Sequence, residues 1–175
     1  MNVAGISSRS RRRPAAAGLL IVSLFVFLAG CGFQLQGRVP LSPVVAAVFI
    51  DASDEQSDFV QALRRSLRQS GARLATRADE PGVAVLRLER DEFVERVASI
   101  SSRNIPREFE VTYLVRYSLD RDGSRRIESE ELAASRDFSF DERAVLAKLR
   151  EREGLREQLA ADLAGRVLQR LASLR

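Results

Sequence analysis

The sequence predicts an α+β fold, a single-domain sandwich in which two helices lie on one face of a mostly antiparallel or mixed sheet of four to five strands. Residues 109–119 alternate apolar and polar side chains, which indicates a half-buried strand. Residues 145–174 carry an apolar stripe at helical spacing. The order along the chain, a strand, a helix, three or four strands and a second helix, is typical of a sheet covered by helices on one side.

Residues 44–50, VVAAVFI, form a short continuous apolar run rich in β-branched side chains. This run predicts a strand near the centre of the sheet that is buried on both faces. Phe59, Leu63 and Leu67 then recur at helical spacing, and Gly71 lies just beyond them. We expect an amphipathic helix that ends at this glycine.

Acidic residues lie around the start of that helix, namely Asp51, Asp54, Glu55 and Asp58. Their spacing is not that of a calcium-binding EF-hand loop. Acids near the positive end of a helix are stabilising without any ligand. We therefore predict no metal site here.

Residues 83–89 predict a strand after the Pro81–Gly82 turn, and residues 93–100 predict either its extension or the next strand. A polar loop over residues 101–107 leads into the alternating strand. This part of the chain therefore supplies most of the predicted sheet.

Residues 120–123, DRDG, turn the chain, and residues 125–140 return as a more polar antiparallel partner. From Asp141 we expect one long helix, bent near Gly154. The helices would cover one face of the sheet, so the other face would be exposed or covered by another molecule.

The N-terminus has the pattern of an export signal. Four arginines precede Pro14, and residues 15–29 carry no charge. This run is shorter than the about 20 residues that a membrane-spanning helix needs. It ends in Leu28-Ala29-Gly30-Cys31, which matches the bacterial lipobox.

We interpret residues 1–30 as a lipoprotein signal peptide that is removed, residues 31–43 as a lipidated tether, and residues 44–175 as the single α+β domain. Cys31 would carry the covalent lipid, and more than one acyl chain is needed for stable anchoring. The residue after it is Gly32 and not Asp, which favours the outer membrane. A buried cysteine in a short core helix and a twin-arginine export signal are the weaker alternatives.

Charge and composition exclude several functions. The chain has 28 basic and 24 acidic residues, and residues 1–30 hold four arginines and no acid, so the mature chain is formally neutral. This argues against a nucleic-acid partner. The chain has no histidine and one cysteine, no G-x-S-x-G motif and no glycine-rich loop before either helix. We expect neither enzyme activity nor a cofactor, apart from the lipid on Cys31.

A series of motifs resembles the LptE family of lipopolysaccharide-assembly lipoproteins. The motifs, in chain order, are CGFQLQG after the lipobox, FIDAS, LRRSLRQSG, LRLE, FEVTYLVRYSL and AVLAKLREREGLREQL. Their order and spacing match over nearly the whole mature chain. One departure is Gln36, where the family often has arginine.

The resemblance implies a non-catalytic subunit of the outer-membrane translocon for lipopolysaccharide. Such a subunit sits as a plug inside the β-barrel protein LptD, assists its assembly and contacts lipopolysaccharide. Its location would be the periplasmic side of the outer membrane and the lumen of the partner barrel.

The resemblance also implies two ligand-binding positions. Lys148 stands in VLAK, where the family has a lysine thought to contact lipopolysaccharide. A second basic position falls on Ser102 or Arg103, depending on the register, which makes Arg103 a candidate. Both cations could instead be ordinary solvated surface residues.

Two other functions stay open from the sequence. The chain could be an outer-membrane lipoprotein that binds peptidoglycan or another envelope partner, with no part in lipopolysaccharide export. It could also be a lipid-anchored hydrolase, which would need a cleft with a pair of carboxyl groups of perturbed pKa.

Overall fold

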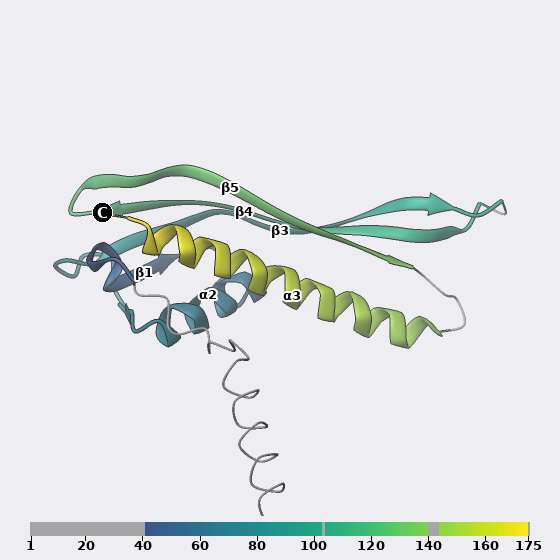
Figure 1. Ribbon diagram of the computed structural model, residues 1–175, viewed down its shortest axis with the longest axis horizontal. Coiled ribbons are helices and arrows are strands. Elements are labelled where there is room, and N and C mark those ends of the chain that lie inside the picture. Colours follow the sequence, from purple (N-terminus) through teal and green to yellow (C-terminus); the bar gives the residue numbers. More distant parts are fainter. Residues whose placement is uncertain (1–40, 103, 140–143, 175) are drawn as a thin grey trace, which may run out of the picture. The chain divides into compact units, whose positions relative to one another are not determined.

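The computed structural model describes residues 41–102, 104–139 and 144–174, which form one layer of strands and one layer of helices (Figure 1). The elements are the 3-10 turn η1 (Pro43–Val45), β1 (Ala47–Asp51), α2 (Asp58–Gln69), β2 (Arg73–Leu74), β3 (Ala84–Ile100), β4 (Pro106–Arg121), β5 (Ser124–Ser139) and α3 (Val145–Ala172). The predicted α+β class is confirmed.

The described strands form one mixed sheet in the order β2-β1-β3-β4-β5. β1 is parallel to both of its neighbours, and β3, β4 and β5 are antiparallel to one another. The sheet is therefore a βαβ unit joined to a long three-stranded meander. The two-residue β2 was not predicted, because so short a strand has no periodicity to detect.

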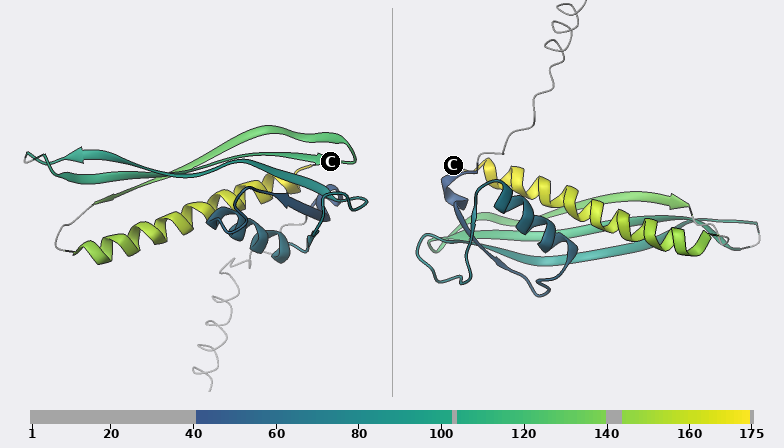
Figure 2. Two further views of the ribbon diagram at one scale, coloured as in Figure 1. Left: turned by 180° about the vertical axis from the view of Figure 1, so that it is seen from behind. Right: turned by 90° about the horizontal axis from the view of Figure 1, so that it is seen from below.

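The prediction for residues 44–50 was only partly right. The first of these residues belong to η1, where Pro43 follows the capping residue Ser42. In β1 the side chains of Val48 and Ile50 are buried, whereas Ala47 and Phe49 are half-buried. Burial on both faces was thus wrong, because in the described part of the chain both helices cover the same face of the sheet (Figures 1 and 2).

The long strands confirm the extension that residues 93–100 suggested. β3 runs without interruption for 17 residues, with a register shift between Leu88 and Arg90. The tight turn to β5 is built by Asp122 and Gly123, whose φ angles are 52° and 74°. Two successive positive φ angles define the hairpin turn that Asp-Gly favours.

Helix α2 begins and ends where the sequence places its signals. The Ser57 side chain caps it by accepting the N–H of Val60 at 3.1 Å. Beyond its last residue, Gly71 adopts a φ of 89°, a conformation that residues with a Cβ rarely take. Its apolar face, with Phe59 and Leu63, is fully buried.

Helix α3 differs from its prediction at one end. Its stripe is buried from Leu159 to Leu171. Val145, Leu146 and Leu149, however, are 42%, 75% and 48% exposed. The apolar stripe thus continues beyond the part of α3 that the core covers, so the prediction of one continuous core face was wrong at the N-terminal end of the helix.

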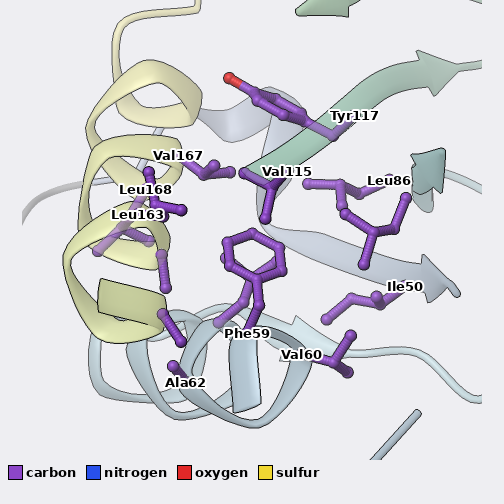
Figure 3. Close-up of a cluster of buried hydrophobic side chains, with 14 of the residues drawn as sticks. Ile50, Phe59, Val60, Ala62, Leu86, Val115, Tyr117, Leu163, Val167 and Leu168 are labelled. Atoms are coloured by element: carbon purple, nitrogen blue, oxygen red, sulfur yellow. The ribbon is translucent and has the colours of Figure 1, made fainter. Parts of the chain in front are cut away.

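The core lies where both helices meet the inner face of the sheet. Figure 3 shows Phe59 of α2 among Val115 and Leu86 of the sheet and Leu163 and Val167 of α3. Because α2 and α3 also pack against each other, these elements share one hydrophobic cluster.

A polar network fixes the start of α2 to the sheet. The Tyr113 hydroxyl donates to Asp91 at 2.7 Å and accepts the N–H of Phe59 at 3.4 Å. The Ser57 hydroxyl donates to the other oxygen of the Asp91 carboxylate. Burial, together with the neighbouring carboxylate, raises the pKa of Tyr113, so the phenol stays a donor.

Two leucines of the same helical stripe allow a matched test of the core. Leu163→Ala should lower the free energy of unfolding by about 2–5 kcal/mol, because it leaves a cavity in a fully buried site. Leu149→Ala should change it by less than about 0.5 kcal/mol, because that side chain is already 48% exposed. Urea unfolding followed by circular dichroism measures both. Equal losses would show that the N-terminal part of α3 is packed as firmly as the rest.

Candidate functional site

Exposed apolar side chains gather at one end of the folded body. Within the described residues, the large apolar side chains that are exposed are Val97, Ile100, Ile105, Val145, Leu146 and Leu149. The first three belong to β3 and its loop to β4, and the last three to the first turns of α3. Figures 1 and 2 place the β3–β4 hairpin and the start of α3 at the same end. We call this surface the apolar end.

Aromatic side chains connect the apolar end to the core. The rings of Phe109 and Phe138 stack with centroids 5.4 Å apart. The strand register places Val97 opposite Phe109, and Phe109 opposite Phe138. An apolar row thus crosses β3, β4 and β5, from the buried Phe138 through the partly buried Phe109 to Val97, which is 52% exposed.

Lys148 lies on α3 beside this surface. Its side chain is 18% exposed, and its Nζ atom lies 2.8 Å from the Glu151 carboxylate and 3.5 Å from the Ser139 hydroxyl. The lysine is therefore held between α3 and the end of β5. An anion that binds Nζ has to compete with Glu151.

Lys148 is the first of three cations spaced four residues apart on α3. Arg152 forms an ion pair with Glu95 of β3 at 3.2 Å, and Arg156 forms one with Asp58 of α2 at 2.6 Å. Side chains at this spacing lie on one face of a helix. The sequence analysis did not single out Arg152 and Arg156, although this spacing was visible in it.

Other arginines at this end have no ion pair in the described part of the chain, namely Arg96, Arg107, Arg136 and Arg150. Arg136 lies two residues before Phe138 on β5, so it projects from the same, helix-facing side of the sheet. Arg96, Glu110 and Asp137 are neighbours in the register and point to the opposite side. The helix-facing side thus carries Arg136, and the far side carries two acids together with Arg96.

The remaining predicted site residues are Cys31 and Arg103, with Ser102 as the alternative to Arg103. Cys31 and Arg103 lie outside the described residues. Ser102, the alternative to Arg103, is exposed in a turn that the Ser101 side chain closes by accepting the N–H of Ile105 at 3.2 Å. Ser101 and Ser102 follow the last residue of β3 and belong to the connection to β4.

Carboxyl chemistry gives no sign of a catalytic pair. The described residues contain no group of three potential metal ligands. The carboxyl groups whose pKa is clearly displaced are Asp79, Glu80, Glu89, Glu92 and Glu130. In each, hydrogen-bonding neighbours lower the pKa; for Glu130 the chief cause is the Arg170 guanidinium. A general acid needs a raised pKa.

Most of the described chain matches a known protein family. The profile of the LptE family, described as lipopolysaccharide-assembly, matches residues 45–171. The chain belongs to this family. The apolar end and Lys148 fall within the matched range.

Two relatives carry the name LPS-assembly lipoprotein LptE. The one from Pectobacterium atrosepticum is 35% identical over 71 residues, which span 38% of this chain and 39% of that relative. The one from Yersinia enterocolitica is 24% identical over 154 residues, which span 87% of this chain and 74% of the relative.

Solved structures agree with the fold. The rare lipoprotein B from Shewanella oneidensis is 28% identical, with a TM-score of 0.63 over 73% of this chain and 94% of its own. Lipoprotein B from Nitrosomonas europaea, 22% identical, has a TM-score of 0.66 over 81% of this chain and 91% of its own. Both share the α+β fold of this chain. In the described part of this chain, no helix is long and apolar enough to cross a bilayer.

Proposed function

We propose that this chain is an outer-membrane lipoprotein subunit of the lipopolysaccharide translocon, the plug and assembly partner of an LptD-type β-barrel. It has no catalytic role and contacts lipopolysaccharide at the apolar end. Family membership and the names of the relatives support a role in lipopolysaccharide assembly. Cys31 would anchor the chain to the membrane.

The apolar end is the observation that carries this proposal. Lipopolysaccharide carries phosphates close to its acyl chains, so a binding surface needs cations next to apolar side chains. Exposed Val145 and Leu149 lie on the same helix as Lys148. The cap residue Ala144 makes no side-chain hydrogen bond to α3, and the first turn of α3 has no acid. The positive end of the helix dipole therefore adds to the attraction for an anion.

The outer face of the sheet suits the wet lumen of a barrel. Arg116 pairs with Glu131 at 2.6 Å, and Arg90 lies 3.7 Å from the same carboxylate. Arg90 also pairs with Glu92 at 2.7 Å. A sheet face that carries several such ion pairs stays hydrated and resists aggregation. Such a face is better suited to a polar environment than to lipid.

Affinity purification from detergent-solubilised outer membrane tests the partner. Chain tagged at the C-terminus should co-purify with an LptD-type barrel in a stable complex of equal stoichiometry. Recovery without a barrel, and with peptidoglycan fragments instead, would favour the peptidoglycan-binding alternative.

Lys148 and Glu151 together test the ligand site. Lys148→Ala and Arg103→Ala should each weaken lipopolysaccharide binding about tenfold, the order expected for one charge-assisted contact. Glu151→Gln should strengthen binding, because it removes the carboxylate that competes for Nζ. Arg166→Ala is the control, since Arg166 lies on the same helix and pairs with Asp162 at 2.7 Å. Binding is measured by microscale thermophoresis with purified lipopolysaccharide.

A role of Lys148 as an ordinary surface cation would give a different pattern. Lys148→Ala would then behave like Arg166→Ala, and Glu151→Gln would leave binding unchanged. Either result would remove Lys148 from the site without touching the assignment of Arg103.

Cys31 is tested separately from the ligand site. Cys31→Ala should abolish incorporation of a clickable palmitate analogue, because it removes the only thiol of the chain. In-gel fluorescence after labelling of growing cells gives the measurement. Gln36→Arg, which restores the residue frequent in the family, should label as the unaltered chain does. Persistent labelling of the alanine variant would contradict the lipoprotein interpretation.

A further inference from the structure

A separate cleft lies at the β2 edge of the sheet, between α2 and the ends of β1 and β2. It has a volume of about 320 Å³. The lining residues are Val48, Phe49, Ile50, Glu55, Arg64, Arg68, Leu74, Ala75 and Thr76. Its floor is apolar and its α2 wall is basic. The carboxyl ends of parallel strands, where this cleft sits, are a common place for binding sites in sheets with βαβ units.

The two arginines of the cleft differ in their bonding. The Arg64 guanidinium is held by the Glu55 carboxylate at 2.9 Å, and its side chain is 23% exposed. Arg68, one helical turn further on, is exposed and has no ion pair or side-chain hydrogen bond within the described residues. Arg68 is thus a cation available to a ligand.

The β2 backbone offers a second contact at the same place. The N–H groups of Arg73 and Ala75 donate to the carbonyl of Ala46, just before β1, at 2.9 Å and to that of Val48 in β1 at 2.8 Å. Because these groups alternate in direction along a strand, the N–H and C=O of Leu74 between them point to the open edge of the sheet. An open edge can pair with an added strand.

The open edge is short, which limits what can bind there. Glu80 pairs with Arg73 at 2.7 Å and accepts the N–H of Thr76 at 3.2 Å. These bonds close the edge beyond Leu74. A ligand can therefore form backbone hydrogen bonds with Leu74 alone, and it needs a side-chain contact in the cleft in addition.

We propose that this cleft docks an extended acidic segment of a partner protein. The segment bridges to the Leu74 backbone and directs one carboxylate to Arg68. An apolar residue two positions away, on the same face of the extended segment, covers the floor formed by Leu74. A free anion would use Arg68 but neither the Leu74 edge nor the apolar floor. A peptide uses all three. Peptide docking at this cleft does not depend on lipopolysaccharide contact at the apolar end, so each proposal can fail without affecting the other.

The test uses the purified chain of residues 31–175, labelled with ¹⁵N, and two capped pentapeptides, Val-Thr-Glu-Thr-Val and Val-Thr-Gln-Thr-Val, whose valines lie on the same face as the central side chain. The glutamate peptide should shift the amide resonances of Leu74 and Thr76. The glutamine peptide and the Arg68→Gln variant should each bind about tenfold more weakly, the order expected for one charge-assisted hydrogen bond.

Arg65→Gln is the matched control. Arg65 is exposed on the same helix, has no ion-pair partner within the described residues, and does not line the cleft. It should leave peptide binding unchanged. Because Arg68 is exposed, Arg68→Gln should also keep the unfolding transition of the unaltered chain.

Three results would overturn the proposal. The first is an absence of shifts at Leu74 with the glutamate peptide. The second is equal binding of the two peptides, or an equal effect of Arg65→Gln and Arg68→Gln. The third is that inorganic phosphate alone reproduces the shifts, which would assign the cleft to a small anion.

Discussion

The helical layer is shorter than the sheet that it covers, and most other features follow from this. β3, β4 and β5 have 16 or 17 residues each, about 50 Å at the rise of an extended strand. α2 has 12 residues, about 18 Å, and only α3, with 28 residues or about 42 Å, can follow the strands. The core therefore forms where both helices lie under the sheet. The rest of the inner face, with the start of α3, becomes the apolar end (Figure 1).

The two halves of α3 are held by different forces. From Leu159 to Leu171 the helix is fixed by apolar burial. Towards its start, Arg152 and Arg156 tie it to β3 and α2 through partly exposed ion pairs. Exposed pairs of this kind contribute at most about 1 kcal/mol each. The first turns of α3 can thus adjust to a ligand without disturbing the core, and the low stability of a binding element is a common property of ligand sites.

The sequence was most informative where a single pattern decides the structure. The alternation of β4, the glycine that ends α2 and the Asp122–Gly123 turn are local signals, and each was predicted. The exposure of Leu149 was not, because it occupies the same helical stripe as the buried Leu163. Leu163 lies where α2 also packs against α3, whereas Leu149 lies beyond the end of the short helix α2. This difference depends on a part of the chain distant in sequence. The candidate site likewise contains both local and long-range contacts. The ion pair of Lys148 with Glu151 follows from their spacing on one helix. The ion pair of Arg152 with Glu95 joins α3 to β3, so only the folded structure shows it.

Residues 31–175 are formally neutral, yet they can still bind anions, because net charge does not show which charges are already paired. On the outer face Arg116 and Glu131 satisfy each other. An unpaired arginine alone does not make a site either, since Arg65 is as free as Arg68 within the described residues. What distinguishes Arg68 is its position beside an apolar floor and an open strand edge. Arg136 is a candidate ligand-binding residue for the same reason, because it projects from the sheet face that bears the Phe109–Phe138 stack. The combination of a free cation with uncovered apolar surface is the basis on which we propose an amphiphilic anion as the ligand at one place and an acidic peptide at the other.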